Sequence, residues 1–150
     1  MIKTMLTDNV VTRGPVWPVM TAAMGTVWNA YGVYQFLGSF AQTKQSLMSV
    51  GMTAAQAELY LSLPAWISVA FAIGVFGGLA GSVALLLRKA LALPLFAVSL
   101  AGYIVLFAGD AYFGIFASMP SQLVLLAVVV AIAAALLWAA SRAKRQGLLA

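Results

Sequence analysis

The feature that most constrains the fold is the stretch from Leu63 to Lys89, which carries no charge until the Arg88-Lys89 pair that ends it. A helix needs about 20 apolar residues to cross roughly 30 Å of hydrocarbon. This stretch is long enough, begins with a proline and a tryptophan, and stops on two cations. It therefore predicts a membrane-spanning helix with its own start and stop signals.

The composition extends this prediction to the whole chain. Of the 150 residues, 64% are hydrophobic and only 7% are charged, whereas a soluble domain carries about 25% charged residues. The net charge of +5 comes mostly from basic residues beside apolar segments, which is typical of charges that set membrane topology. We therefore expect the lipid bilayer as a partner and no binding of nucleic acid.

The chain lacks the residues that most often carry chemistry. It has no cysteine, no histidine and only three acidic residues, so it has no thiolate or imidazole ligand and lacks the commonest general base. We expect no catalytic residues, no metal site and no intrinsic cofactor. A bound lipid, quinone or pigment remains open.

Apolar segments predict an all-α fold with four transmembrane helices in an up-down antiparallel bundle, forming one membrane domain. The spans lie at about residues 15–40, 64–87, 91–116 and 121–141. Between the first two spans, Thr53 and Gln56 have the spacing of a capping box, which predicts a short amphipathic surface helix at about residues 53–63. Before the first span, apolar residues from Ile2 to Val10 are compatible with an interfacial helix or a frayed tail.

Basic residues mark one side of this bundle. They gather at both termini and in the turn between the second and third spans, and the positive-inside rule places these parts in the cytoplasm. The candidates for contacts with lipid headgroups are Arg88, Lys89, Arg142, Lys144 and Arg145.

Small residues in the second span predict close helix packing. Without a hydrophobic driving force in lipid, small side chains let helix backbones approach each other. The candidate packing face consists of Gly74, Gly77, Gly78, Gly81 and Ser82. The pattern leaves open whether this face meets a helix of the same chain, a second copy or another membrane-protein subunit.

Polar and aromatic residues gather in the outer halves of the first and third spans. The candidate ligand-binding residues are Trp28, Asn29, Gln35, Tyr103 and Asp110. Two alternatives stay open, because Asn29 and Gln35 are also suited to hydrogen bonds between helices, and Asp110 lies close enough to the end of its span to meet water.

The run from Ala57 to Leu100 resembles the signature region of small bacterial four-span membrane proteins that are often labelled sugar transporters. Its most specific parts are Pro64-Ala65-Trp66 and the glycine-rich run into Arg88-Lys89, and the Trp28-Asn29 element of the first span fits as well. The resemblance covers most of residues 16–148. It implies a four-span fold in a bacterial inner membrane, and it brings no established binding residues.

Two functions follow as expectations. The first is a non-catalytic accessory subunit that packs against a larger membrane complex, with an energy-transducing assembly as one setting. The alternative is a small oligomeric transporter or channel, for sugar or protons, that uses the polar layer on the first and third spans. Transport usually requires discontinuous helices around a midplane site, and no span here is interrupted in its middle.

Overall fold

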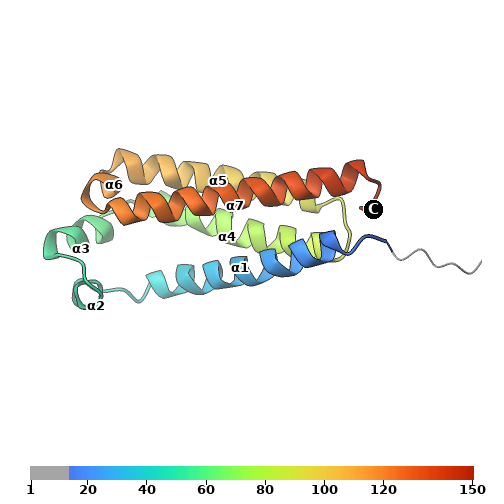
Figure 1. The fold of residues 1–150 in the computed structure, drawn as a ribbon. Helices are drawn as coiled ribbons and strands as arrows, with labels where there is room; N and C mark the ends of the chain where they lie inside the picture. Colours follow the sequence, from blue (N-terminus) through green and yellow to red (C-terminus); the bar gives the residue numbers. More distant parts are fainter. Residues whose placement is uncertain (1–13) are drawn as a thin grey trace, which may run out of the picture.

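The computed structural model describes residues 14–150. Its four long helices lie side by side (Figure 1). The interfacial helix considered for Ile2 to Val10 lies outside the described residues. Within them there are helices and no strands, so the prediction of an all-helical chain is confirmed. The long helices are α1 (Trp17–Ser39), α4 (Ala65–Leu86), α5 (Ala92–Tyr112) and α7 (Pro120–Arg145), and the short ones are α2 (Lys44–Ser49), α3 (Ala54–Leu61) and α6 (Ile115–Ser118).

Three of the long helices are long and apolar enough to cross a membrane, namely α4, α5 and α7. This confirms the prediction of a membrane protein. Helix α1 is more polar, because it carries Asn29, Gln35 and two threonines. Its 23 residues, at roughly 1.5 Å each, give a length of about 34 Å, which matches the hydrocarbon thickness.

Prolines and one glycine set several helix boundaries. Pro18 lies in the first turn of α1 and Pro120 begins α7. The N–H groups of a first turn have no partner within the helix, so the missing N–H of proline costs nothing there. Gly114 adopts a left-handed conformation with φ 77° and separates α5 from α6, as glycine does without steric cost. The predicted third span at residues 91–116 is therefore divided, and its long helix ends at Tyr112.

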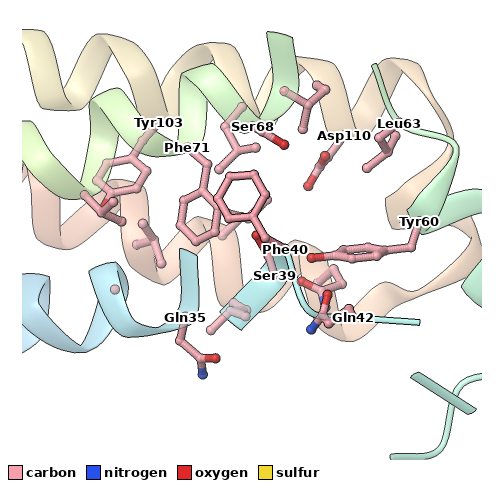
Figure 2. A pocket seen from close by; sticks show the side chains of 18 of the residues that line it. Gln35, Ser39, Phe40, Gln42, Tyr60, Leu63, Ser68, Phe71, Tyr103 and Asp110 are labelled. Atoms are coloured by element: carbon pink, nitrogen blue, oxygen red, sulfur yellow. The ribbon is translucent and has the colours of Figure 1, made fainter. Parts of the chain in front are cut away.

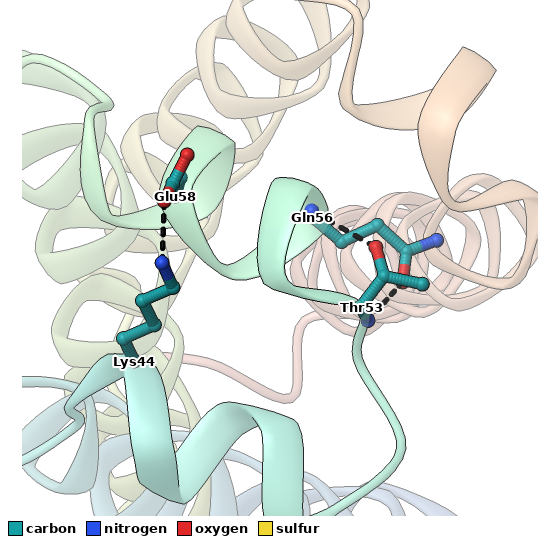
Figure 3. A network of polar contacts seen from close by, with 4 residues as sticks. All are labelled: Lys44, Thr53, Gln56 and Glu58. Atoms are coloured by element: carbon teal, nitrogen blue, oxygen red, sulfur yellow. Dashed lines mark hydrogen bonds and ion pairs between the residues drawn. The ribbon is translucent and has the colours of Figure 1, made fainter.

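The segment between α1 and α4 forms two short helices rather than one. Both capping boxes are formed, the predicted one at Thr53 and Gln56 and a second at Thr43 and Ser46. In the first, the Gln56 N–H donates to Thr53 Oγ1 at 3.1 Å and the Thr53 N–H to Gln56 Oε1 at 2.9 Å (Figure 3). The Gln56 Nε2 amide also donates to the Ser118 carbonyl at 2.9 Å, so this segment is fastened to the end of α6.

Helix α4 is the central helix, and its contact with α5 is the closest in the fold. Three glycines of α4 lie against α5, in the order Gly74 against Tyr103, Gly77 against Ser99 and Gly81 against Phe96. The Ser99 hydroxyl donates to the Gly74 carbonyl at 2.6 Å. From the other side, Gly102 lies directly on the α4 backbone, where an added Cβ would be 2.9 Å from the Gly74 nitrogen.

The other two residues of the predicted packing face, Gly78 and Ser82, face α1. Gly78 lies against the Asn29 side chain, and Ser82 lies against Gly25, where an added Cβ would be 2.7 Å from the Ser82 hydroxyl. All five residues of the predicted packing face are therefore in contact with helices of the same chain.

Helices α1 and α7 meet at one end only. There Trp17 and Trp138 both lie against the Arg142 guanidinium, whose carbon is 5.4 Å from each ring centre. Ala22 and Leu136 belong to the hydrophobic cluster that fills the same end. Toward the α2–α3 end, α1 diverges from the other helices (Figure 1), and this divergence creates the cavity described next.

Candidate ligand cavity

A cavity of about 540 Å³ lies between the four long helices at the end where α1 diverges from α7, and the segment containing α2 and α3 covers it (Figure 2). Its volume falls in the range of about 300–1,000 Å³ that is typical of small-molecule sites. Tyr31 of α1 and Leu125 of α7 line it and are both more than half exposed. The cavity is therefore open sideways between these two helices, and it is also open beside Phe40 and Val50, which line it and are more exposed still.

Each long helix contributes one stripe of side chains to the wall. Residues three and four positions apart share a helix face. The stripes are Trp28, Gly32 and Gln35 on α1; Ile67, Phe71 and Val75 on α4; Tyr103, Leu106 and Asp110 on α5; and Gln122, Leu126 and Val129 on α7. The wall is thus largely apolar and aromatic, with a few polar groups at separate points.

Among residues 14–150, Asp110 is the only acidic side chain in this wall. It is 8% exposed, and its Oδ1 oxygen is buried without a hydrogen-bond partner among residues 14–150. Figure 2 shows its carboxyl group pointing into the cavity, toward the side where Tyr60 lies. A buried carboxyl without a partner is costly, so this group is the strongest sign of a ligand contact in the molecule.

Two polar residues from the covering segment lie in the same wall. Tyr60 of α3 is mostly buried, and its pKa is raised, first by burial and then by the charge of Asp110. Gln42, between α1 and α2, also has a buried side-chain oxygen without a partner within the described chain. The covered end of the cavity therefore combines a carboxyl, a phenol and an amide.

Four of the five predicted ligand-binding residues line this one cavity: Trp28, Gln35, Tyr103 and Asp110. Asn29 does not, because its side chain is 2% exposed against α4 and its Nδ2 donates to the Gly25 carbonyl of its own helix at 2.8 Å. The Gln35 amide donates to the Tyr31 hydroxyl at 2.6 Å, which is also a bond within α1. Helix α5 continues two residues beyond Asp110, so the aspartate lies inside the helix and not past its end.

The sequence interpretation missed the covering residues Phe40, Gln42, Leu47 and Tyr60 and the α4 residues Ser68 and Phe71. Tyr60 had one local signal, since it follows the Thr53 capping box on a short amphipathic helix. That signal gives the helix but not the direction in which the segment folds back over the bundle.

The predicted headgroup residues lie far from the cavity. Arg88 is in the turn after α4, and its Nη2 donates to the Pro15 carbonyl at 3.4 Å. Arg142 lies between two tryptophans at the end of α7. Lys89 follows Arg88, and Lys144 and Arg145 are in the last turn of α7. These five basic residues thus gather at the end of the bundle opposite to the cavity.

The described residues contain no group of three or more His, Cys, Asp or Glu side chains that could hold a metal ion. Comparison with models of protein families, with curated proteins and with solved structures finds no match.

Proposed function

We propose that this chain is a non-catalytic accessory protein of a bacterial inner membrane, and that it holds an amphiphilic small molecule in the cavity between α1 and α7. The observation that carries the proposal is a 540 Å³ cavity with apolar walls, a sideways opening and one buried carboxyl. Ligand sites are typically apolar pockets with a few polar groups that fix orientation. A molecule with a long apolar part and a small polar group fits this arrangement.

The proposal includes four membrane spans, with α1 as the fourth, and both termini in the cytoplasm. Its support is the length of α1, its position beside the three apolar helices (Figure 1), and the basic residues at one end of the bundle. Trp17 and Trp138 lie at that end, whereas Trp66 lies in the first turn of α4 at the other, as expected for aromatic residues at two membrane interfaces.

The chain has no cysteine, so single cysteines test this topology cleanly. In intact cells of a host with the outer membrane permeabilised, Ser49→Cys should react with a membrane-impermeant maleimide. Gln146→Cys should react only after the inner membrane is opened. Equal labelling of both variants in intact cells would contradict the proposed orientation.

Holding a ligand is favoured over transport because the cavity ends inside the bundle. The far end is filled by a packed cluster that includes Ala22, Leu85, Phe96, Leu136 and Ala140. The transporter alternative is tested by uptake of sugars or protons into proteoliposomes. Flux above that of empty vesicles would favour transport over holding.

For the role as an accessory subunit, we propose that a partner subunit packs on the outer face of α1. This face is apolar and exposed, and it contains Met20, Met24, Val27 and Tyr34. Purification from native membranes in a mild detergent should bring partner subunits along with the chain. A lone 15.7 kDa species would contradict the accessory role while leaving the cavity untouched.

Ligand binding is tested on the full chain in lipid nanodiscs with radiolabelled decyl compounds, using empty nanodiscs to subtract partitioning into lipid. Val129→Phe adds bulk inside the cavity wall and should reduce binding of any decyl compound by about tenfold or more, since overpacking of a filled site costs at least 1–3 kcal/mol. Val128→Phe is the matched control, because Val128 is not in the wall and is exposed. If no decyl compound binds above empty nanodiscs, the cavity is not a ligand site.

A further inference from the structure

The chemistry of the cavity narrows the class of ligand that it accepts, and this inference rests on the function proposed above. Two acceptor oxygens of the wall are buried and lack a donor among residues 14–150, Asp110 Oδ1 and Gln42 Oε1. A ligand that satisfies both must supply hydrogen-bond donors. Because an unpaired buried acceptor costs far more than a paired one, these two atoms select for such a ligand.

The charges around the cavity narrow the class of ligand further. The basic residues of the described chain are all engaged or placed elsewhere. Lys44 is paired with Glu58 outside the bundle, Arg88 reaches Pro15, and Arg142 lies between Trp17 and Trp138. The others, Lys89, Lys144 and Arg145, lie at the end of the bundle that Arg88 and Arg142 occupy. Residues 14–150 therefore supply no cation to complement an ionised Asp110, and a cationic ligand group would fill that role.

The remainder of the wall suits an alkyl chain or an apolar ring system attached to that charge. Trp28, Phe71 and Tyr103 line the part of the cavity that lies deeper in the bundle, and Leu126 and Val129 of α7 lie along it. In Figure 2 the carboxyl of Asp110 lies toward the covered end, beyond Phe71 and Tyr103.

From this arrangement we propose that the cavity binds a cationic amphiphile, with an N–H-bearing ammonium group on Asp110 and Gln42 and its apolar part between α1 and α7. A metal ion is a poor alternative, because one carboxylate cannot provide the six to eight oxygen ligands of calcium or the octahedral set of magnesium. A neutral ligand such as a quinone would need Asp110 to act as a donor, which leaves the Gln42 oxygen without a partner.

The experiment compares decylammonium with decanol, which has the same chain and no charge, on the full chain in nanodiscs. Decylammonium should bind wild type at least about tenfold more tightly than decanol, the ratio expected for a charge-assisted hydrogen bond. In Asp110→Asn this preference should fall to about twofold or less, while decanol binding stays unchanged. Asp110→Glu, which keeps the charge, should retain part of the preference.

Glu58→Gln is the matched control, because it removes the other acidic side chain of the described chain from a position outside the cavity. It should leave the decylammonium preference unchanged. Equal binding of decylammonium and decanol to wild type would overturn the cation assignment, even if Asp110→Asn does not fold. The same holds if Asp110→Asn keeps the preference, or if decyl-quinone binding depends on Asp110 while decylammonium binding does not. Failure of every decyl compound to bind would instead refute the cavity as a ligand site.

Discussion

The contacts of α4 and the gap between α1 and α7 show two opposite uses of side-chain size within one bundle. Along α4, glycines and serine let α5 and α1 approach so closely that a methyl group added at a glycine would meet an aromatic ring, Ser99 or the Asn29 amide. Between α1 and α7, large aromatic and polar residues line a cavity instead. The contacts among α1, α4 and α5 therefore form the tightly packed part of the molecule, and the gap between α1 and α7 is left open.

The largest expected effect comes from adding bulk to the closest contact. Gly102→Leu would push a side chain against the backbone nitrogen of Gly74 and the carbonyl of Ala70, so α4 and α5 must separate. We expect a loss of about 2–3 kcal/mol or a failure to fold, measured by thermal unfolding in detergent.

Two control variants test whether the loss of stability in Gly102→Leu comes from the contact between α4 and α5. Gly38→Leu adds the same side chain where nothing lies within 4 Å and should leave the unfolding temperature nearly unchanged. Val129→Phe adds bulk to the open gap and should also cost little stability. If Gly102→Leu unfolds at the temperature of Gly38→Leu, the contrast between the tight layer and the open gap is wrong.

A smaller and more specific effect is expected at the contact between α1 and α4. Gly78→Ala places a methyl group against the Asn29 side chain, and Asn29→Ala removes that obstacle. The double variant should therefore be more stable than the sum of the single changes predicts, by about 1–2 kcal/mol. Thermal or denaturant unfolding of all four proteins gives this coupling, and additive changes would mean that Asn29 does not contact Gly78.

The smallest effect is expected at the ion pair between α2 and α3. A hydrogen bond from Lys44, helped by its charge, holds the pKa of Glu58 below its ordinary value of 4.5. The contribution of the pair is therefore present above that pH and declines as the pH falls below it. Because both side chains are exposed, Glu58→Gln should shift the unfolding temperature at pH 7 by less than the measurement resolves. A clear shift would show that the covering segment is held mainly by this pair.

Most of the fold is predictable from the sequence because its causes are local. The apolar run of α4, the proline at the start of α7 and the Thr53 capping box each act within a few residues. The division of the third span was missed, since one glycine at position 114 ends α5 through its own backbone conformation. Helix α2 was missed because its capping box uses Ser46 where the usual pattern has Glu or Gln.

The site was predictable in part, because depth along parallel helices is a simple count of residues. That count brings Trp28, Gln35, Tyr103 and Asp110 together. It does not give the rotation of each helix about its axis, which turns Asn29 toward α4 and out of the cavity. Nor does it give the folding back of residues 40–63, which depends on long-range contacts such as that between Gln56 and Ser118.

The sideways opening between α1 and α7 has a consequence for selectivity. For a ligand that enters from the bilayer, the occupancy of the cavity depends on the mole fraction of the ligand in lipid and not on its molarity in water. Each methylene added to an alkyl chain raises partitioning into lipid by about 0.8 kcal/mol, or roughly fourfold. If affinity is calculated from the aqueous ligand concentration, its dependence on chain length would then reflect mainly partitioning into the bilayer. Preference for the headgroup would report on the protein itself.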